Sequence, residues 1–211
     1  IKAGKKISIA GRRHSQGGHI MTDDAIVLDM TSFNKIIGLD TQKNLLTVQS
    51  GTTWAQIQDF LNQKNLAVKV QQSSNIFTVG GTLSVNAHGR DPRFGPIIET
   101  VDSFRLMKAD GSLVTASRTE NPELFSLVIG GYGLFGIITD VTLSVTNNAV
   151  LQKSTRTMNC NQYPDYLVNH VLKNPKIELH YARPDITKKH FMKNCSVTSY
   201  SHIADHPDSL T

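Results

Sequence analysis

A glycine-rich segment directly after a predicted strand carries the residues of this chain that are best suited to bind or react with a ligand. Residues 9–19 read Ile-Ala-Gly-Arg-Arg-His-Ser-Gln-Gly-Gly-His. Glycines allow neighbouring backbone N–H groups to point together into a concave nest, which suits a phosphate or diphosphate group. Arg12 and Arg13 add positive charge, and His14 stands where its side chain can meet a bound group. A surface turn with incidental basic residues explains this stretch alone about equally well, because short glycine motifs are weak evidence.

A second segment of the same character covers residues 78–89, which read Thr-Val-Gly-Gly-Thr-Leu-Ser-Val-Asn-Ala-His-Gly. Small hydroxyl side chains surround its two adjacent glycines. Backbone N–H groups and hydroxyl groups therefore converge again, and no large side chain blocks a close ligand. The second segment makes a ligand-binding interpretation of the first one stronger.

A third glycine-rich stretch, residues 130–138, joins a predicted helix to a β-branched strand. Each glycine costs backbone entropy when the chain folds. Three such segments in one chain therefore indicate that one large polar ligand lies against the backbone at several points.

Length and composition narrow the class of protein. The chain has 211 residues, enough for one domain and part of another, and 39% of them are hydrophobic. No run of about 18 apolar residues predicts a membrane span. The net charge of +5 comes without a dense lysine and arginine run, which argues against a nucleic-acid partner. Attraction of an anionic cofactor or substrate is a sufficient reason for this charge.

The cysteines and histidines do not predict a metal site. Cys160 and Cys195 lack metal-ligand spacing, and both a disulfide and two free thiols remain open for them. The chain begins at Ile1 without an initiator methionine and ends in polar sequence. We therefore expect a piece of a longer protein, and the sequence predicts neither its compartment nor its oligomeric state.

Periodicity predicts the elements that must position these segments. Strands are expected at residues 6–10, 25–28, 35–39, 45–49, 66–70, 101–108, 112–116 and 135–145. The clearest helix is predicted at residues 53–65, where Thr53 and Gln56 form a capping box. Trp54, Ile57 and Leu61 recur on one apolar face of it, which indicates core packing. A second helix is expected from Pro122, with Asn121 as its cap.

The pattern changes near residue 147. A strand at 150–157, a helix at 163–173 and a strand at 176–183 indicate the start of a different α+β unit. We therefore expect one domain over residues 1–147 and the beginning of a second one over residues 148–211.

Taken in order, the three glycine segments resemble the FAD-binding domain of the vanillyl-alcohol oxidase/p-cresol methylhydroxylase (PCMH) flavoprotein superfamily. Residues 11–15 are similar to the Gly-x-x-His-Ser diphosphate loop of cytokinin dehydrogenases and aldonolactone oxidases. Residues 79–84 resemble the second loop of cytokinin dehydrogenases. Residues 87–90 and 130–138 are closer to the lactone oxidases and to decaprenylphosphoryl-ribose oxidase.

This resemblance implies an α+β, two-subdomain PCMH-type FAD-binding fold over residues 1–147. It lacks the first strand and helix of the family and is followed by the start of a substrate or cap domain. The implied cofactor is FAD, and the implied partner is a small-molecule substrate. Relatives with two flavin bonds carry a cysteine just before the second loop, and residues 71–77 contain none. A second covalent flavin bond is therefore not expected.

The resemblance also implies site residues. The predicted FAD contacts are Gly11, Arg12, Arg13, His14, Ser15, His19, Thr78, Gly80, Gly81, Thr82, Ser84, Gly136 and Ile137. In the related families the histidine equivalent to His14 often carries the flavin covalently. His88 is a candidate catalytic residue, and the alternative is a core histidine that is bonded to neighbouring backbone. The expected reaction takes a hydride equivalent from a CH-OH group of a sugar, polyol or lactone. The alternatives are an amine substrate and a catalytically inactive FAD-binding module.

Overall fold

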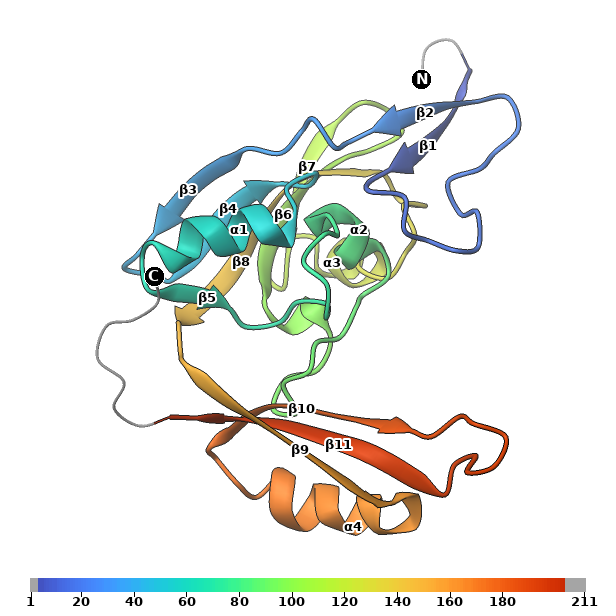
Figure 1. Ribbon diagram of the computed structural model, residues 1–211. Coiled ribbons are helices and arrows are strands. Elements are labelled where there is room, and N and C mark those ends of the chain that lie inside the picture. Colours follow the sequence, from blue (N-terminus) through green and yellow to red (C-terminus); the bar gives the residue numbers. More distant parts are fainter. Residues whose placement is uncertain (1–3, 204–211) are drawn as a thin grey trace. The chain divides into compact units, whose positions relative to one another are not determined.

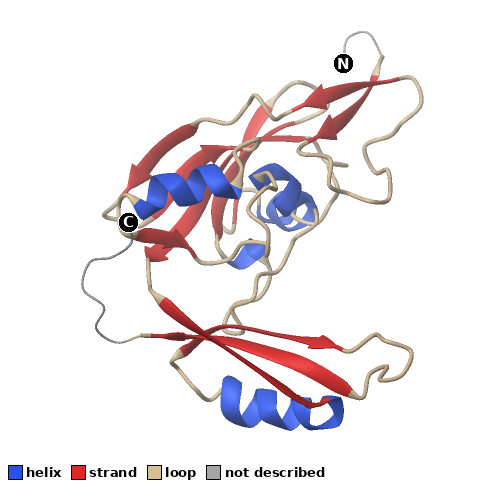
Figure 2. Cartoon of the chain, viewed as in Figure 1, coloured by secondary structure: helices blue, strands red, loops and turns tan. Residues whose placement is uncertain are grey.

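The structure is a computed structural model that describes residues 4–203. The chain divides into two units (Figures 1 and 2). Unit 1 contains the residues up to Gly89 together with Gly95–Asn147. Unit 2 contains Arg90–Phe94 and the residues from Asn148 onward. The short segment Arg90–Phe94 therefore interrupts unit 1 in sequence while belonging to unit 2.

An antiparallel sheet forms the centre of unit 1. Its strand order is β3 (Ile36–Asp40), β4 (Leu45–Gln49), β8 (Ile137–Asn147), β6 (Val101–Met107) and β7 (Leu113–Ser117). The long strand β8 also pairs with β5 (Leu66–Val68). The predicted strands are all present, with ends that differ from the predicted ones by at most two residues. The mixture of sheet and helices confirms the α+β fold class.

A small parallel sheet carries the first glycine segment. Strand β1 (Lys6–Ala10) pairs with β2 (Ala25–Asp29). Parallel neighbours need a long connection, and residues 11–24 provide it. The glycine segment therefore starts at the point where β1 ends.

Helix α1 (Trp54–Asn62) confirms the predicted capping box. The N–H of Gln56 donates to Oγ1 of Thr53 at 3.3 Å, and the N–H of Thr53 donates to Oε1 of Gln56 at 3.0 Å. Trp54, Ile57 and Leu61 are fully buried in the core of unit 1. The helix ends three residues earlier than predicted. Asn65, the last residue of the predicted helix, has a left-handed φ of 55°, which a right-handed helix does not allow.

Two predictions of local structure need correction. The second glycine segment is the short helix α2 (Val79–Ser84) rather than a loop, because Thr78 caps it by accepting from the N–H of Gly81 at 3.3 Å. Helix α3 (Pro122–Val128) starts where predicted, but Asn121 does not cap it through its side chain. The amide of Asn121 instead donates to the carbonyl of Thr115 at 2.7 Å, and its backbone is left-handed.

Unit 2 contains a three-stranded antiparallel sheet in the order β10-β11-β9. The strands are β9 (Leu151–Asn159), β10 (Ile177–Pro184) and β11 (Asn194–His202), and short helical turns at Cys160–Gln162, α4 (Tyr163–Tyr166) and Leu167–Val171 connect β9 to β10. Strand β11 was not predicted, although it pairs with both other strands. Cys160 and Cys195 are free thiols. No helix within residues 4–203 is long and apolar enough to cross a membrane.

The sheet of unit 2 has a buried polar side chain beneath its helical turns. His180 lies between the hydroxyls of Ser199, 3.0 Å from Nδ1, and Tyr163, 3.2 Å from Nε2. Burial lowers the pKa of His180, and the charge of Arg156 lowers it further. The imidazole is therefore a neutral member of this network near neutral pH.

Candidate functional site

Unit 1 contains a cavity of about 410 Å³, a size typical of small-molecule sites. All three glycine-rich segments reach it. The predicted site residues that line it are Gly11, Arg12, Arg13, His14, Ser15, His19, Thr78, Gly80, Gly81, Ser84 and Gly136. Thr82, Ile137 and His88 are not among the lining residues.

Helix α2 joins the walls of the cavity through backbone hydrogen bonds. The N–H of Gly80 donates to the carbonyl of Ser50 at the end of β4, at 2.7 Å. The N–H of Gly130 donates to the carbonyl of Leu83 at 2.9 Å. The second glycine segment is therefore fastened both to the main sheet and to the third glycine segment.

Close packing against the glycine backbone explains two of the glycines. A Cβ atom at Gly11 would lie 2.4 Å from Oγ1 of Thr78, which leaves no room for a side chain. Gly136 has a φ of +144°, and a Cβ there would lie 2.5 Å from the carbonyl oxygen of Met107. The backbone itself therefore forms these parts of the cavity wall, so its N–H and C=O groups can approach a ligand closely.

Ser50 is the most informative polar side chain in the cavity wall. Its exposed fraction is 3%, and it lines the cavity. Within residues 4–203 its hydroxyl is one of two buried side-chain polar atoms without a hydrogen-bond partner, the other being Oε1 of Gln71. An unsatisfied buried hydroxyl costs about 1–3 kcal/mol, so a ligand that bonds to it would recover this cost.

A buried relay positions a second polar side chain at the cavity. The indole N–H of Trp54 donates to Oγ1 of Thr82 at 2.9 Å, and the Thr82 hydroxyl donates to Oε1 of Gln72 at 2.6 Å. Gln72 lines the cavity. The hydroxyl of Thr82, which the sequence assigned to the cofactor, is thus used inside the protein.

Sequence reasoning missed Ser50 and Gln72. A signal for Ser50 exists, because it directly precedes Gly51 at the end of a strand. A Cβ at Gly51 would lie 1.8 Å from the carbonyl oxygen of Met30, so the chain must turn tightly there. Gln72 has no comparable local signal, because only the relay through Thr82 identifies it.

The charged residues of the first glycine segment have different partners. Arg13 forms an ion pair with Asp29 at 2.8 Å. The hydroxyl and N–H of Thr31 lower the pKa of Asp29, and the charge of Arg13 lowers it further, so this carboxylate stays ionised. Within residues 4–203, Arg12 forms neither an ion pair nor a hydrogen bond. Arg12 is therefore the cation of this segment that is left for an anionic ligand.

Three histidines were singled out by the sequence, and two reach the cavity. The ring of His14 contacts Phe77 edge-on, with ring centroids 4.9 Å apart. The ring centroids of His19 and Tyr132 are 5.4 Å apart. His88 is exposed, and its Nδ1 lies 2.9 Å from the carbonyl oxygen of Gly89. Its catalytic role stays a prediction. In the described part of the chain no three His, Cys, Asp or Glu side chains gather as metal ligands.

Comparison with known proteins identifies the ligand of such a domain. The family model for an FAD binding domain matches residues 2–117. L-gulonolactone oxidase of Bos taurus is 26% identical over 80% of this chain and 38% of its own length. L-galactono-1,4-lactone dehydrogenase 1, mitochondrial, of Oryza sativa subsp. japonica is 31% identical over 64% of this chain and 23% of its own. Cytokinin dehydrogenase 2 of Arabidopsis thaliana is 31% identical over 64% and 27%. The match to this chain thus covers less than two fifths of each relative.

Two hydroxyl deletions should change the stability of the ligand-free chain by different amounts. Ser50→Ala removes a hydroxyl without a partner, so the free energy of unfolding should fall by less than about 0.5 kcal/mol or rise. Thr82→Val removes a hydroxyl that Trp54 and Gln72 both use, and should cost about 1–3 kcal/mol. Urea denaturation followed by circular dichroism measures both. An equal loss in the two variants would show that Ser50 has a partner within the protein.

Proposed function

This chain belongs to the family of FAD-binding domains, and from this premise we propose that its FAD lies in the cavity of unit 1. The observation that carries the proposal is the convergence of all three glycine segments on that one cavity. In this arrangement the backbone of residues 11–15 and 80–84 binds the diphosphate, and the backbone of Gly136 faces the adenosine end.

The residues of the cavity fit this cofactor. The unpaired cation Arg12 and the glycine-rich backbone match a diphosphate, which carries negative charge and several acceptor oxygens. The buried hydroxyl of Ser50 lacks a protein partner and suits an uncharged polar group of the cofactor. Gln72 also lines the cavity, and its amide oxygen is held by the Thr82 hydroxyl. These two side chains orient the cofactor, and the apolar residues around them exclude water.

We further propose that the intact protein is an FAD-dependent oxidoreductase acting on a CH-OH group of a sugar, polyol or lactone. Bound FAD supplies the acceptor for a hydride equivalent, and the protein binds and orients both reactants. The names of the lactone oxidase and lactone dehydrogenase relatives support this substrate class. In this proposal residues 148–211 begin the substrate or cap domain.

The reaction is tested with the full-length protein loaded with FAD and kept free of oxygen. Sugars, polyols and aldonolactones should bleach the visible absorption of the oxidised flavin. Bleaching by N6-substituted adenines alone would instead support the amine alternative, which the cytokinin dehydrogenase relative suggests. Retention of the oxidised spectrum with every donor, although FAD is bound, would leave a binding module and contradict the proposed reaction.

The position of FAD is tested by Gly81→Val. Gly81 is exposed, and an added Cβ would meet only Oγ1 of Thr78, at 3.0 Å. The side chain should block the approach of the diphosphate and lower FAD affinity about tenfold or more, with less than about 1 kcal/mol lost in unfolding free energy. Gly38→Val in β3 is the matched control, because nothing lies within 4 Å of its Cβ position and Gly38 does not line the cavity. Equal FAD affinity in the wild type and Gly81→Val would contradict this placement.

We also propose that His14 carries the flavin covalently in the intact protein. His14 lines the cavity, follows the two arginines of the first glycine segment, and contacts Phe77. After acid precipitation of the full-length protein, the flavin should stay in the pellet, and mass spectrometry should find it on the peptide of His14. His19 in the same segment provides the internal comparison. Complete release of flavin into the supernatant, with an unmodified His14 peptide, would exclude the bond.

A further inference from the structure

A tyrosine on the sheet of unit 2 lies against two arginines. The guanidinium carbon of Arg90 is 4.1 Å from the ring centroid of Tyr181, and that of Arg183 is 4.9 Å from the same centroid. The two positive charges are therefore no more than 9.0 Å apart, the sum of these distances. Both arginines and the tyrosine belong to unit 2, and none of them lines the FAD cavity.

Neither arginine has an anionic partner. Within residues 4–203, Arg90 and Arg183 form no ion pair and no side-chain hydrogen bond. Arg93 provides the contrast, because it pairs with both Asp91 and Glu178. The aromatic ring stabilises the two cations, but it leaves their N–H donors without acceptors. Two like charges held this close, with free donors, are the electrostatic arrangement expected of a site for an anion.

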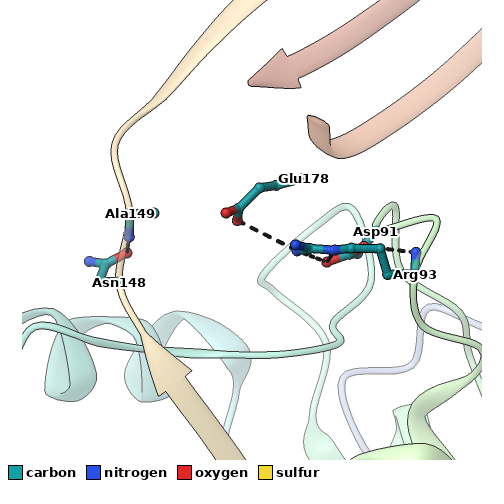
Figure 3. Close-up of polar contacts among 5 residues, drawn as sticks. All are labelled: Asp91, Arg93, Asn148, Ala149 and Glu178. Atoms are coloured by element: carbon teal, nitrogen blue, oxygen red, sulfur yellow. Dashed lines mark hydrogen bonds and ion pairs between the residues drawn. The ribbon is translucent and has the colours of Figure 1, made fainter. Parts of the chain in front are cut away.

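Two sets of contacts hold the segment of Arg90 in this place, and Figure 3 shows the ion pairs of Arg93 among them. The backbone N–H of His180 donates to the backbone carbonyl of Arg90 at 2.8 Å, which holds the segment Arg90–Phe94 against β10. Nε of Arg93 donates to both carboxylate oxygens of the buried Asp91, at 2.8 and 3.1 Å, and its guanidinium lies 3.7 Å from Glu178. These contacts fix the backbone that carries Arg90, so the position of its side chain over Tyr181 depends on the fold of the segment.

Hydroxyl groups extend the cluster across the sheet. Tyr181 pairs with Thr198 of β11, which in turn pairs with Thr155 of β9, and the two threonine hydroxyls are 3.0 Å apart. The preceding residue of β10, His180, contacts Tyr163 of α4, so Tyr181 faces the other side of the sheet. Thr198 and Thr155 therefore lie on the same face of the sheet as Tyr181, the face that α4 does not cover.

The phenol of Tyr181 responds to these surroundings. A hydrogen bond from Thr198 lowers its pKa most, a hydrogen bond with Tyr200 adds to this, and the charges of Arg183 and Arg90 lower the pKa further. The surroundings of this ring thus favour the ionised form of the phenol.

We propose that Arg90, Tyr181 and Arg183 form a binding site for the oxyanion group, a carboxylate or a phosphate, of a small organic molecule. The planar guanidinium presents paired N–H donors that match these two groups. The site itself does not depend on FAD. Where the proposed oxidoreductase function also holds, the site makes acidic or phosphorylated sugars better ligands than neutral ones.

Isothermal titration calorimetry of the full chain, saturated with FAD so that the diphosphate site is occupied, tests the proposal. The probes are D-gluconate, inorganic phosphate and neutral D-glucose in a phosphate-free buffer. Saturable binding of gluconate or phosphate, but not of glucose, is expected, and the tighter of the two anions identifies the group. Arg90→Gln and Arg183→Gln should each weaken that binding about tenfold or more. Arg90→Lys keeps the charge but not the planar fork and should fall between the wild type and Arg90→Gln.

Arg156→Gln is the matched control. Arg156 lies 4.0 Å above the ring of Tyr166, a single arginine on a single aromatic ring outside the cluster. Its loss lowers the net charge equally and should leave anion binding unchanged. Equal weakening in Arg156→Gln would show general attraction to a basic chain and would overturn the proposal, as would the absence of saturable anion binding. In Gly81→Val we expect a loss of FAD affinity with anion binding retained, which would show that the two sites are independent.

Discussion

The arrangement of unit 1 depends on the backbone hydrogen bonds that hold helix α2 in the middle of the cavity wall. Helix α2 receives its position from the end of β4 through Ser50 and from the third glycine segment through Gly130 and Tyr132. Each bond joins segments that lie far apart in the sequence. Because these contacts are between backbones, glycine or a small residue is needed where the segments meet, as Gly80 shows against the carbonyl oxygen of Ser50. The glycines of this chain therefore serve packing and ligand approach together.

The polar side chains of the cavity fall into two groups with different physical roles. The hydroxyl of Thr82 forms hydrogen bonds with Trp54 and Gln72, and these bonds connect the core to the cavity wall. Ser50 lies equally deep but has no such partner. A buried relay that is satisfied stabilises the protein, whereas a buried hydroxyl that is unsatisfied is stabilised only by a ligand. This difference separates residues that hold the FAD-binding domain together from residues available to the cofactor.

Unit 2 shows how an ion cluster can fix a functional side chain without contacting a ligand. Asp91 and Glu178 share Arg93, and this leaves the neighbouring Arg90 without a carboxylate. Ion pairs at a surface contribute little to stability, but here one partner is buried and the geometry is bidentate. The cluster therefore acts mainly on position. It holds Arg90 at the sheet of unit 2, although in the sequence the segment Arg90–Phe94 lies between the two parts of unit 1.

The sequence by itself determined the features that depend on neighbouring residues. Strands β1 and β4 have the predicted bounds, and Thr53 and Gln56 form the predicted capping box, because strand alternation and capping are local. The membership in an FAD-binding family also follows from local motifs. Only the tertiary structure decided that the glycines at 80 and 81 lie in a helix, that β11 completes a sheet, and that Ser50 lacks a partner. The approach of Arg90 to Tyr181 belongs with these. Each depends on atoms distant in sequence, and no local pattern records which groups folding brings together or leaves unpaired.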